Sequence, residues 1–296
     1  MNIIGNKKIF ISISLLLTIA SIVAIAIFGF KFAIDFSGGT LWQLSFEEPV
    51  TREELQSFTI ETLKIESPII TEETSGDSFF IRMPEISEEE HREHRESLVE
   101  EFGAVTELRY ETIGSAIGKE LRSRSLTAFI LVLVAISLYI AFAFRKVLHP
   151  VSSWKYGIIT LVSLFHDALV PAGLYAVLGY YYGAEVDTNF VVAILVVIGF
   201  SVHDTIVVFD RIRENLRSAG SAARDEFDGI VNTSVNQTFA RSINTSLTLF
   251  LVVVALFFWG APSLRYFMLV IGVGTVIGTY SSIFLASPLL TLWKKK

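Results

Sequence analysis

Six long apolar runs decide what this chain can fold into. The first covers residues 9–30 and contains no charged residue, and five more cover residues 126–144, 157–178, 188–209, 242–259 and 266–293. A bilayer core of about 30 Å requires about 20 predominantly apolar residues in one helix. The sequence therefore predicts an α-helical polytopic membrane protein with six transmembrane helices, arranged as one span, an intervening domain and five further spans.

The first run has a competing interpretation as a cleaved signal peptide. The segment Ala24-Ile25-Ala26 resembles a signal-peptidase site. However, the run is longer than the apolar core of a signal peptide, and the alanines lie inside it. We therefore expect an uncleaved first span.

Composition separates the intervening segment from the rest of the chain. Overall, 52% of the residues are hydrophobic and 18% are charged, whereas soluble domains have about 25% charged residues. Residues 31–125 hold 21 acidic and 10 basic residues, and the remainder of the chain is net basic. The net charge of −6 gives no indication of nucleic-acid binding, and the absence of cysteine excludes disulfides and thiolate chemistry.

The distribution of lysine and arginine predicts the orientation. With six spans, four basic groups fall on one side of the membrane, and the two short loops on the other side hold one basic residue between them. We therefore expect both termini to be cytoplasmic and residues 31–125 to be extracytoplasmic. The expected domains are residues 1–30 with the first span, residues 31–125, and residues 126–296 with a cytoplasmic loop at about 210–241.

The extracytoplasmic segment has the pattern of a small α+β domain. Capping boxes begin helices at Thr51 with Glu54 and at Ser87 with Glu90. Strands are predicted at residues 40–46, 69–74, 78–83 and 105–112, with Ser75-Gly76-Asp77 as a hairpin turn. The order β-α-β-β-α-β predicts a ferredoxin-like fold, which by itself names no function.

Two histidines on the second of these helices invite a metal interpretation. His91 and His94 are three residues apart, with arginines between and beside them. Two imidazoles alone make a poor metal site. We favour a solvated, charged helix face and expect no metal.

Ionisable residues inside the predicted spans are the strongest functional signal. The third span carries His166 and Asp167, and the fourth carries His203 and Asp204. Such groups cost about 2.5–3.5 kcal/mol on insertion scales, so each is by default a functional-site hypothesis. The alternative is a structural hydrogen bond between two helices; we favour function for Asp204 and leave both interpretations open for the pair in the third span.

Polar residues accompany Asp204 at helical spacing. Ser201 and Thr205 share its stripe on the fourth span, and Arg241 opens the fifth span with Asn244 and Thr245 on its own stripe. This arginine could face Asp204 or could serve only as a positive-inside determinant. The sequence lacks zinc-protease, serine-hydrolase and phosphate-loop motifs. A non-enzymatic protein driven by an ion gradient or a partner is therefore expected, and the residue types suit proton relay.

Four segments resemble motifs of the SecD/SecF family. The resemblance extends over essentially the whole chain and follows the arrangement of the SecF members. These segments are Asp35-Phe36-Ser37-Gly38-Gly39, the pair His166-Asp167, residues 199–215 around Asp204, and residues 236–242 ending in Arg241-Ser242. The sequence departs from the family pattern at Ser115, where proline is usual, and at His203, where asparagine is common.

The resemblance implies a function in protein export. It implies a multi-pass protein of the bacterial plasma membrane that belongs to the resistance-nodulation-division superfamily. This protein would pair with SecD. Together they would assist the Sec translocon channel and its accessory subunits late in the translocation of unfolded polypeptides. The energy would come from the proton gradient, and the protein would need no cofactor. Membrane lipid would surround the spans. Asp204 would be the protonatable carboxylate, Arg241 its charge partner, and Asp35, Gly38 and Gly39 the junction between the membrane and the outer domain.

Three other classes of function stay open at this point. One is a proton-driven exporter of small molecules or lipids from the same superfamily, although such exporters usually carry a second six-span half. Another is an intramembrane protease using two aspartates. The third is a scaffold that transports nothing, for which Asp204 variants would be silent.

Overall fold

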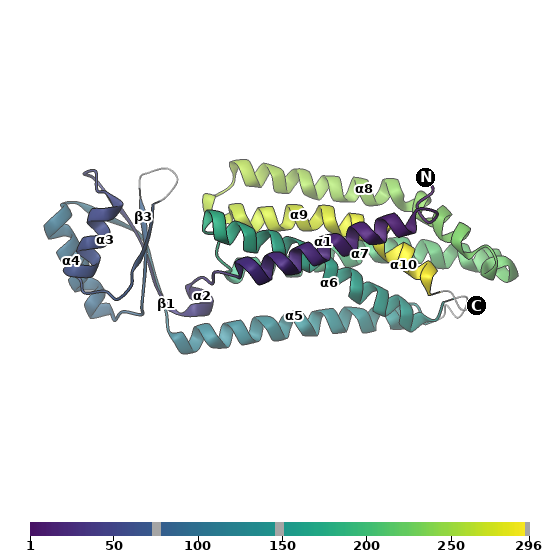
Figure 1. Ribbon diagram of the computed structural model, residues 1–296, viewed down its shortest axis with the longest axis horizontal. Helices are drawn as coiled ribbons and strands as arrows, with labels where there is room; N and C mark the ends of the chain where they lie inside the picture. The colour runs from purple at the N-terminus through teal and green to yellow at the C-terminus, as the bar shows by residue number, and fades with distance from the viewer. Residues whose placement is uncertain (73–77, 146–150, 294–296) are drawn as a thin grey trace. The chain divides into compact units, whose positions relative to one another are not determined.

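A computed structural model describes residues 1–72, 78–145 and 151–293. The chain divides into two compact units. One comprises Met1–Lys31 with Thr127–Lys296 and is helical, and the other comprises Phe32–Leu126 and contains the β-sheet (Figure 1).

The described residues contain six helices that are long and apolar enough to cross a membrane. They are α1 (Lys7–Phe28), α5 (Ser115–Ala143), α6 (Ser153–Tyr182), α7 (Thr188–Ala219), α8 (Phe227–Trp259) and a last segment at Arg265–Leu292. The prediction of six spans in a one-plus-five arrangement is confirmed.

Several helices extend beyond the apolar runs that predict them. Helix α5 begins at Ser115 rather than near residue 126, and α7 and α8 occupy most of the expected loop at residues 210–241. The stretch at 210–241 is thus largely helical, and residues 220–226, including the 3₁₀ turn η1 (Gly220–Arg224), connect the two helices. Hydropathy identifies only the part of a helix that lipid surrounds, whereas i,i+3 ion pairs such as Arg211–Glu214 stabilise the polar extension.

The last span is not one continuous α-helix. Helix α9 (Arg265–Ser281) passes into a π-helical turn, η3 (Ser282–Ala286), and then into α10 (Ser287–Leu292). Pro288 lies in the first turn of α10. Because proline has no N–H and collides with the carbonyl four residues before it, the wider π turn relieves a conflict that a regular helix would contain.

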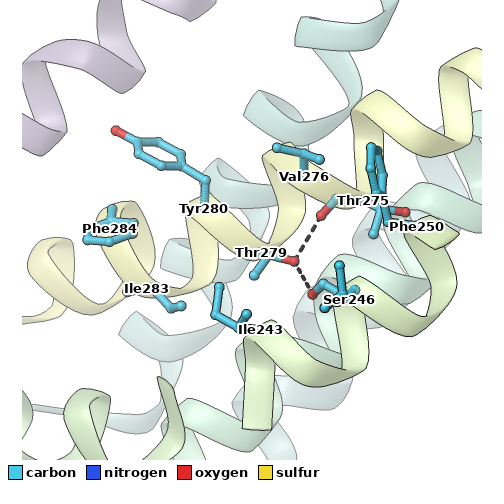
Figure 2. A pocket seen from close by; sticks show the side chains of 10 residues that line it. Ile243, Ser246, Phe250, Thr275, Val276, Thr279, Tyr280, Ile283 and Phe284 are labelled. Carbon is cyan, nitrogen blue, oxygen red and sulfur yellow. Dashed lines mark hydrogen bonds between the residues drawn. The ribbon is translucent and has the colours of Figure 1, made fainter. Parts of the chain in front are cut away.

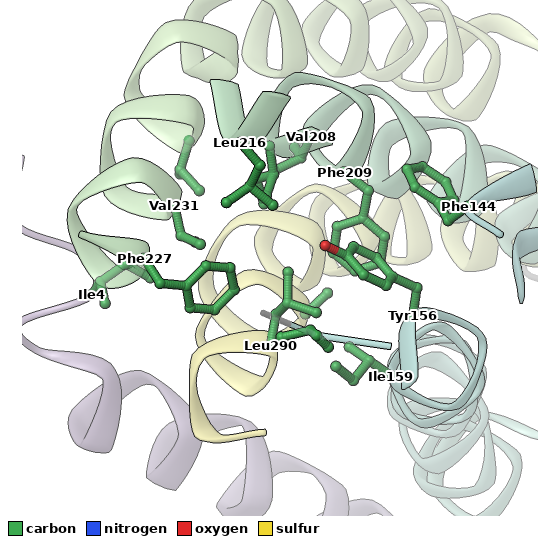
Figure 3. Close-up of a cluster of buried hydrophobic side chains, with 14 of the residues drawn as sticks. Ile4, Phe144, Tyr156, Ile159, Val208, Phe209, Leu216, Phe227, Val231 and Leu290 are labelled. Carbon is green, nitrogen blue, oxygen red and sulfur yellow. The ribbon is translucent and has the colours of Figure 1, made fainter. Parts of the chain in front are cut away.

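A cluster of buried hydrophobic side chains packs one end of the helical unit, hereafter the membrane unit. Tyr156 of α6, Phe209 of α7, Phe227 of α8 and Leu290 of α10 meet there and are fully buried (Figure 3). Ile4, which precedes α1, belongs to the same cluster and is 3% exposed. The end of the bundle is thus closed by apolar packing from helices that are far apart in sequence.

Two glycines on α9 bring this helix close to α7. A Cβ added to Gly274 would lie 2.2 Å from Val197 Cγ2, and one added to Gly278 would lie 3.0 Å from Ser201 Cβ. Small residues four apart allow membrane helices to approach closely. This contact sets the register in which polar side chains of the two helices meet.

The second unit confirms the ferredoxin-like prediction. Its elements are β1 (Gly39–Phe46), α3 (Arg52–Glu61), β2 (Ile69–Glu72), β3 (Phe79–Met83), α4 (Glu88–Phe102) and β4 (Val105–Ile113), preceded by the short helix α2 (Ile34–Ser37). The described strands form an antiparallel sheet in the order β2-β3-β1-β4. Both capping boxes are present, whereas the predicted turn at residues 75–77 lies outside the described residues.

The prediction of a solvated histidine pair on α4 is wrong for His91. This side chain is buried, its Nε2 lies 2.7 Å from Glu107 Oε2, and its ring stacks on Tyr110 at 3.7 Å. The indole N–H of Trp42 donates to the same carboxylate oxygen at 2.7 Å. Sequence spacing placed His91 on the charged face, but it belongs to the edge of the buried stripe that also contains Leu98.

Candidate functional site

Two aspartates are buried inside the membrane unit. Asp167 lies on α6 and is 0% exposed, and Asp204 lies on α7 and is 4% exposed. Each is approached by a serine from the interior of the last span, where Ser281 ends α9 and Ser282 begins the π turn. The site therefore draws on α6, α7 and the α9–η3 junction.

The carboxylate of Asp167 accepts three hydrogen bonds. Its Oδ1 lies 2.8 Å from Nδ1 of His166. Its Oδ2 accepts from the hydroxyls of Ser201 and, at 2.6 Å, of Ser281. A buried carboxylate needs such donors to offset the loss of water. Asp167 is thus held from three elements at once.

The carboxylate of Asp204 is less completely satisfied. Its Oδ2 accepts from Ser282 Oγ at 2.5 Å. Ser242 of α8 lies beside it, but the Ser242 hydroxyl makes no hydrogen bond of good geometry, and neither does the buried hydroxyl of Thr205. Two buried hydroxyls without partners therefore lie on the helices that surround this carboxylate.

Sequence reasoning placed the aspartates correctly inside the spans but chose the wrong partner for Asp204. Ser201, expected to flank Asp204, donates instead to Asp167. Ser281 and Ser282 were missed altogether. The available signal was a pair of serines following Thr275 and Thr279 in an otherwise apolar run, since small hydroxyl residues in spans often mediate helix contacts.

A second hydroxyl contact lies next to the aspartate site. The hydroxyls of Ser246 on α8 and Thr279 on α9 are hydrogen-bonded, and Thr279 also donates to the carbonyl of Thr275 at 2.9 Å. These side chains line a groove of about 300 Å³ whose other walls are mostly apolar and include Phe250 and Phe284 (Figure 2). This contact joins α8 to α9 near the serines that hold the aspartates.

The structure does not bring the predicted fifth-span stripe to Asp204. Arg241, Asn244 and Thr245 are exposed, whereas Ser242 and Ser246 form the buried stripe of α8. His203 is likewise exposed on α7. The helical phase of α8 differs from the expected one, so Asp204 is surrounded by hydroxyls and not by the guanidinium.

The glycines of the first motif lie where three elements of the second unit meet. Gly38 and Gly39 have φ angles of +75° and +115°. A Cβ on Gly38 would lie 2.7 Å from Cα of Ser115, the first residue of α5, and one on Gly39 would lie 2.7 Å from the carbonyl oxygen of Met83. Asp35 lies one turn earlier, in α2. Glycine is thus required here by both backbone conformation and space.

No group of three or more His, Cys, Asp or Glu side chains in the described part of the chain gathers closely enough to hold a metal ion. The buried site contains carboxylates, hydroxyls and one imidazole. Such groups exchange protons.

Two family models match the chain. The model described as protein export membrane protein SecD/SecF, C-terminal, matches residues 94–296, and the SecD/SecF GG motif matches residues 23–50. The second match contains Asp35, Gly38 and Gly39.

Among curated proteins, the chain is similar to subunits of protein translocases. It is 42% identical to the protein translocase subunit SecF of Thermobaculum terrenum, covering 100% of this chain and 94% of the relative. It is 36% identical to the SecF subunit of Anaerolinea thermophila, covering 99% and 94%. It is also 35% identical to the protein translocase subunit SecDF of Thermus thermophilus, covering 100% of this chain but 39% of that longer protein.

A solved structure has the same fold. The crystal structure of SecDF from Thermus thermophilus, a translocon-associated membrane protein, matches with a TM-score of 0.83 and 35% identity. The match covers 99% of this chain and 38% of that chain.

Proposed function

The chain belongs to the SecD/SecF family of protein export membrane proteins, and we propose that it acts as the SecF subunit of a bacterial Sec translocase that uses the proton gradient to assist late stages of polypeptide export. Its curated relatives that match over nearly their full length are SecF subunits. The observation that carries the proton-driven part is the pair of aspartates buried in the membrane unit and held by serine hydroxyls.

In this proposal Asp204 is the residue that gains and loses the proton. It has one hydrogen-bonded donor, Ser282, and the buried hydroxyls of Thr205 and Ser242 on α7 and α8 have no hydrogen-bond partner. Asp167 has three donors and is the fixed member of the pair, with His166 beside it. A change of charge at Asp204 therefore disturbs fewer hydrogen bonds than one at Asp167.

The proton gradient is the proposed energy source, with no cofactor. One elementary charge crossing 100 mV yields about 2.3 kcal/mol. A free-energy difference of this size changes the equilibrium constant between two conformations by about fifty-fold. A single proton at Asp204 is thus sufficient to drive a conformational step of the subunit.

SecD is the proposed partner. The Thermus relative carries SecD and SecF in one chain by its name, and this chain matches 39% of it. Exposed polar groups on the spans support a covering partner: Asn244 and Thr245 of α8 and His203 of α7 lie within apolar runs, where bare lipid contact is costly. We propose that SecD covers Arg241, Asn244, Thr245 and His203, so that Arg241 acts across this interface.

The α+β unit is proposed to face the extracytoplasmic side, where it would meet the emerging polypeptide. The basis is the grouping of basic residues on the opposite side of the spans. The same argument supports cytoplasmic termini. The proposed location of the subunit is the plasma membrane, next to the translocon channel.

The Asp204→Asn variant tests the proton site. Asparagine keeps the size and the hydrogen bond from Ser282 but cannot take up a proton. We expect normal insertion and assembly with SecD, together with loss of gradient-dependent export. The measurement is export of a secreted protein into inverted membrane vesicles, with and without an uncoupler.

Matched variants make the result specific. Glu93→Gln, an exposed change on α4, is expected to export normally. Arg241→Ala is expected to fail, and Arg241→Lys to keep part of the activity if charge alone matters. Wild-type export that stays uncoupler-sensitive in Asp204→Asn would refute the assignment of the proton to this residue.

A further inference from the structure

Ser282 has two acceptors for one hydroxyl proton. Its Oγ lies 2.5 Å from Asp204 Oδ2 and 3.0 Å from the carbonyl oxygen of Thr279. A serine hydroxyl has a single O–H donor and two acceptor lone pairs. The two hydrogen bonds are therefore alternatives, and which one forms depends on what the carboxylate needs.

The ionisation state of Asp204 selects between them. An ionised carboxylate is an acceptor only, so Ser282 donates to it. When a proton arrives on Oδ2, the acid O–H donates to Ser282 Oγ, and the serine proton turns to the carbonyl of Thr279. When the proton leaves, the hydrogen bond to Thr279 breaks and Ser282 again donates to Asp204. The Ser282 hydroxyl and Asp204 Oδ2 therefore stay hydrogen-bonded to each other whether Asp204 is ionised or protonated.

The carbonyl that accepts the hydrogen bond from Ser282 lies close to the π turn. Thr279 is in the last turn of α9, and the π turn begins at Ser282 itself. The carbonyl of Ser282 accepts from Ser287 Oγ at 2.9 Å. π turns are less regular than α-helix and are frequent at functional sites. Protonation of Asp204 thus adds a hydrogen bond next to the least regular part of the last span.

The neighbouring serine fixes the other side of the junction. Ser281 donates to Asp167 Oδ2 at 2.6 Å, with the carbonyl of Gly278 at 3.0 Å as its alternative. Asp167 also holds Ser201 and His166. Because Asp167 stays bound from three elements, Ser281 anchors the end of α9 while Ser282 changes its partner.

The π turn leads directly to contacts with other spans. In α10, Leu290 lies in the buried cluster, and Thr291 accepts from Lys7 Nζ at 3.1 Å. Lys7 is the first residue of α1 and also pairs with Asp228 of α8 at 2.9 Å. A change in the π turn is therefore passed to α1 and α8 through α10.

We infer that Ser282 is the residue that converts protonation of Asp204 into a change of the α9 backbone, by turning its hydroxyl from the Asp204 carboxylate to the Thr279 carbonyl. This role rests on the proposed proton site at Asp204. Ser282 acts as a positioning residue, because its hydroxyl keeps its proton throughout and only turns from one acceptor to the other.

The test uses the full chain reconstituted with SecD, and the Ser282→Ala, Ser282→Thr and Ser246→Ala variants. Ser246 is the matched control, since it is a buried serine bonded to Thr279 and to a backbone carbonyl but to no carboxylate. Infrared difference spectra between high and low pH report the carbonyl stretch of the protonated acid, assigned by its loss in Asp204→Asn. Gradient-driven export is measured on the same preparations.

In Ser282→Ala the acid O–H loses its acceptor, so its carbonyl band is expected at higher wavenumber. Export is expected to fall about tenfold, the equivalent of one hydrogen bond to a charged group. Ser282→Thr keeps the hydroxyl and is expected to restore both readouts, which a purely steric role of Ser282 does not predict. Ser246→Ala is expected to leave the band unchanged.

The outcomes separate this inference from the proposed function. A band at the wild-type position in Ser282→Ala would overturn the inference alone, as would failure of Ser282→Thr to restore export. If Asp204→Asn removes no band, the proton site itself is wrong, and the inference fails with it.

Discussion

The close contact of α9 with α7 gives a quantitative prediction for Gly278→Ala. The new Cβ would lie 3.0 Å from Ser201 Cβ and 3.3 Å from Ser201 Cα. Because the second atom belongs to the backbone, a side-chain rotation cannot relieve the contact, and α7 must move by a few tenths of an ångström. Overpacking of this kind costs about 1–3 kcal/mol.

Helix propensity works in the opposite direction and must be removed from the measurement. Replacing glycine by alanine inside a helix gains about 1 kcal/mol. Gly199→Ala on α7 is the matched control, since a Cβ there meets nothing within 4 Å. The difference between the two variants isolates the packing cost and is expected to be about 1–3 kcal/mol, with Gly278→Ala the less stable.

The assay is reversible unfolding of the full chain in mixed micelles by a denaturing detergent, followed by tryptophan fluorescence. Movement of Ser201 also weakens its hydrogen bond to Asp167, so export is expected to fall in Gly278→Ala. Equal stability of the two variants, within about 0.5 kcal/mol, would refute the argument that this glycine sets the distance between α7 and α9.

Three further outcomes are expected. A reporter fused at Glu185 should be extracytoplasmic and one at Ala222 cytoplasmic, and the reverse pattern would overturn the orientation. Residues 36–112 expressed alone should give the circular dichroism of a folded α+β domain, and a disordered spectrum would contradict its independence. In that domain, hydrogen bonds from the backbone N–H and hydroxyl of Ser87 hold the pKa of Glu90 below its ordinary value, so the stability it contributes is present above the unfolded pKa and is lost as pH falls through the depressed one. Glu90→Gln should therefore flatten the loss of thermal stability on acidification, and an unchanged acid profile would count against the capping box.

Local signals in the sequence were sufficient for the elements of the fold. Capping boxes at Thr51 and Ser87 placed the starts of α3 and α4, because a cap depends on residues only three positions apart. Apolar length found the spans for the same reason. It could not find the extension of α5 back to Ser115, because a polar helix outside the lipid leaves no hydropathy signal.

The partners of the buried aspartates depend on how helices are rotated against one another. The sequence indicated Asp167 and Asp204 as buried groups, since charge in a span is costly wherever it lies. It could not indicate that Ser282 rather than Arg241 meets Asp204, because that choice depends on the phase of α8 and on the approach of α9 at Gly278. Hydroxyl residues in an apolar run carry little signal until this geometry is known.

The π turn also has a consequence for which changes in length the chain can tolerate. Such a turn absorbs one residue more than an α-helical turn, so removing one residue from 282–286 would leave the helices on either side in nearly the same phase. A one-residue change elsewhere in the last span would instead rotate everything after it by about 100°, which would take Leu290 out of the buried cluster and turn Thr291 away from Lys7. The helical phase of the last span is therefore least sensitive to a one-residue deletion within 282–286.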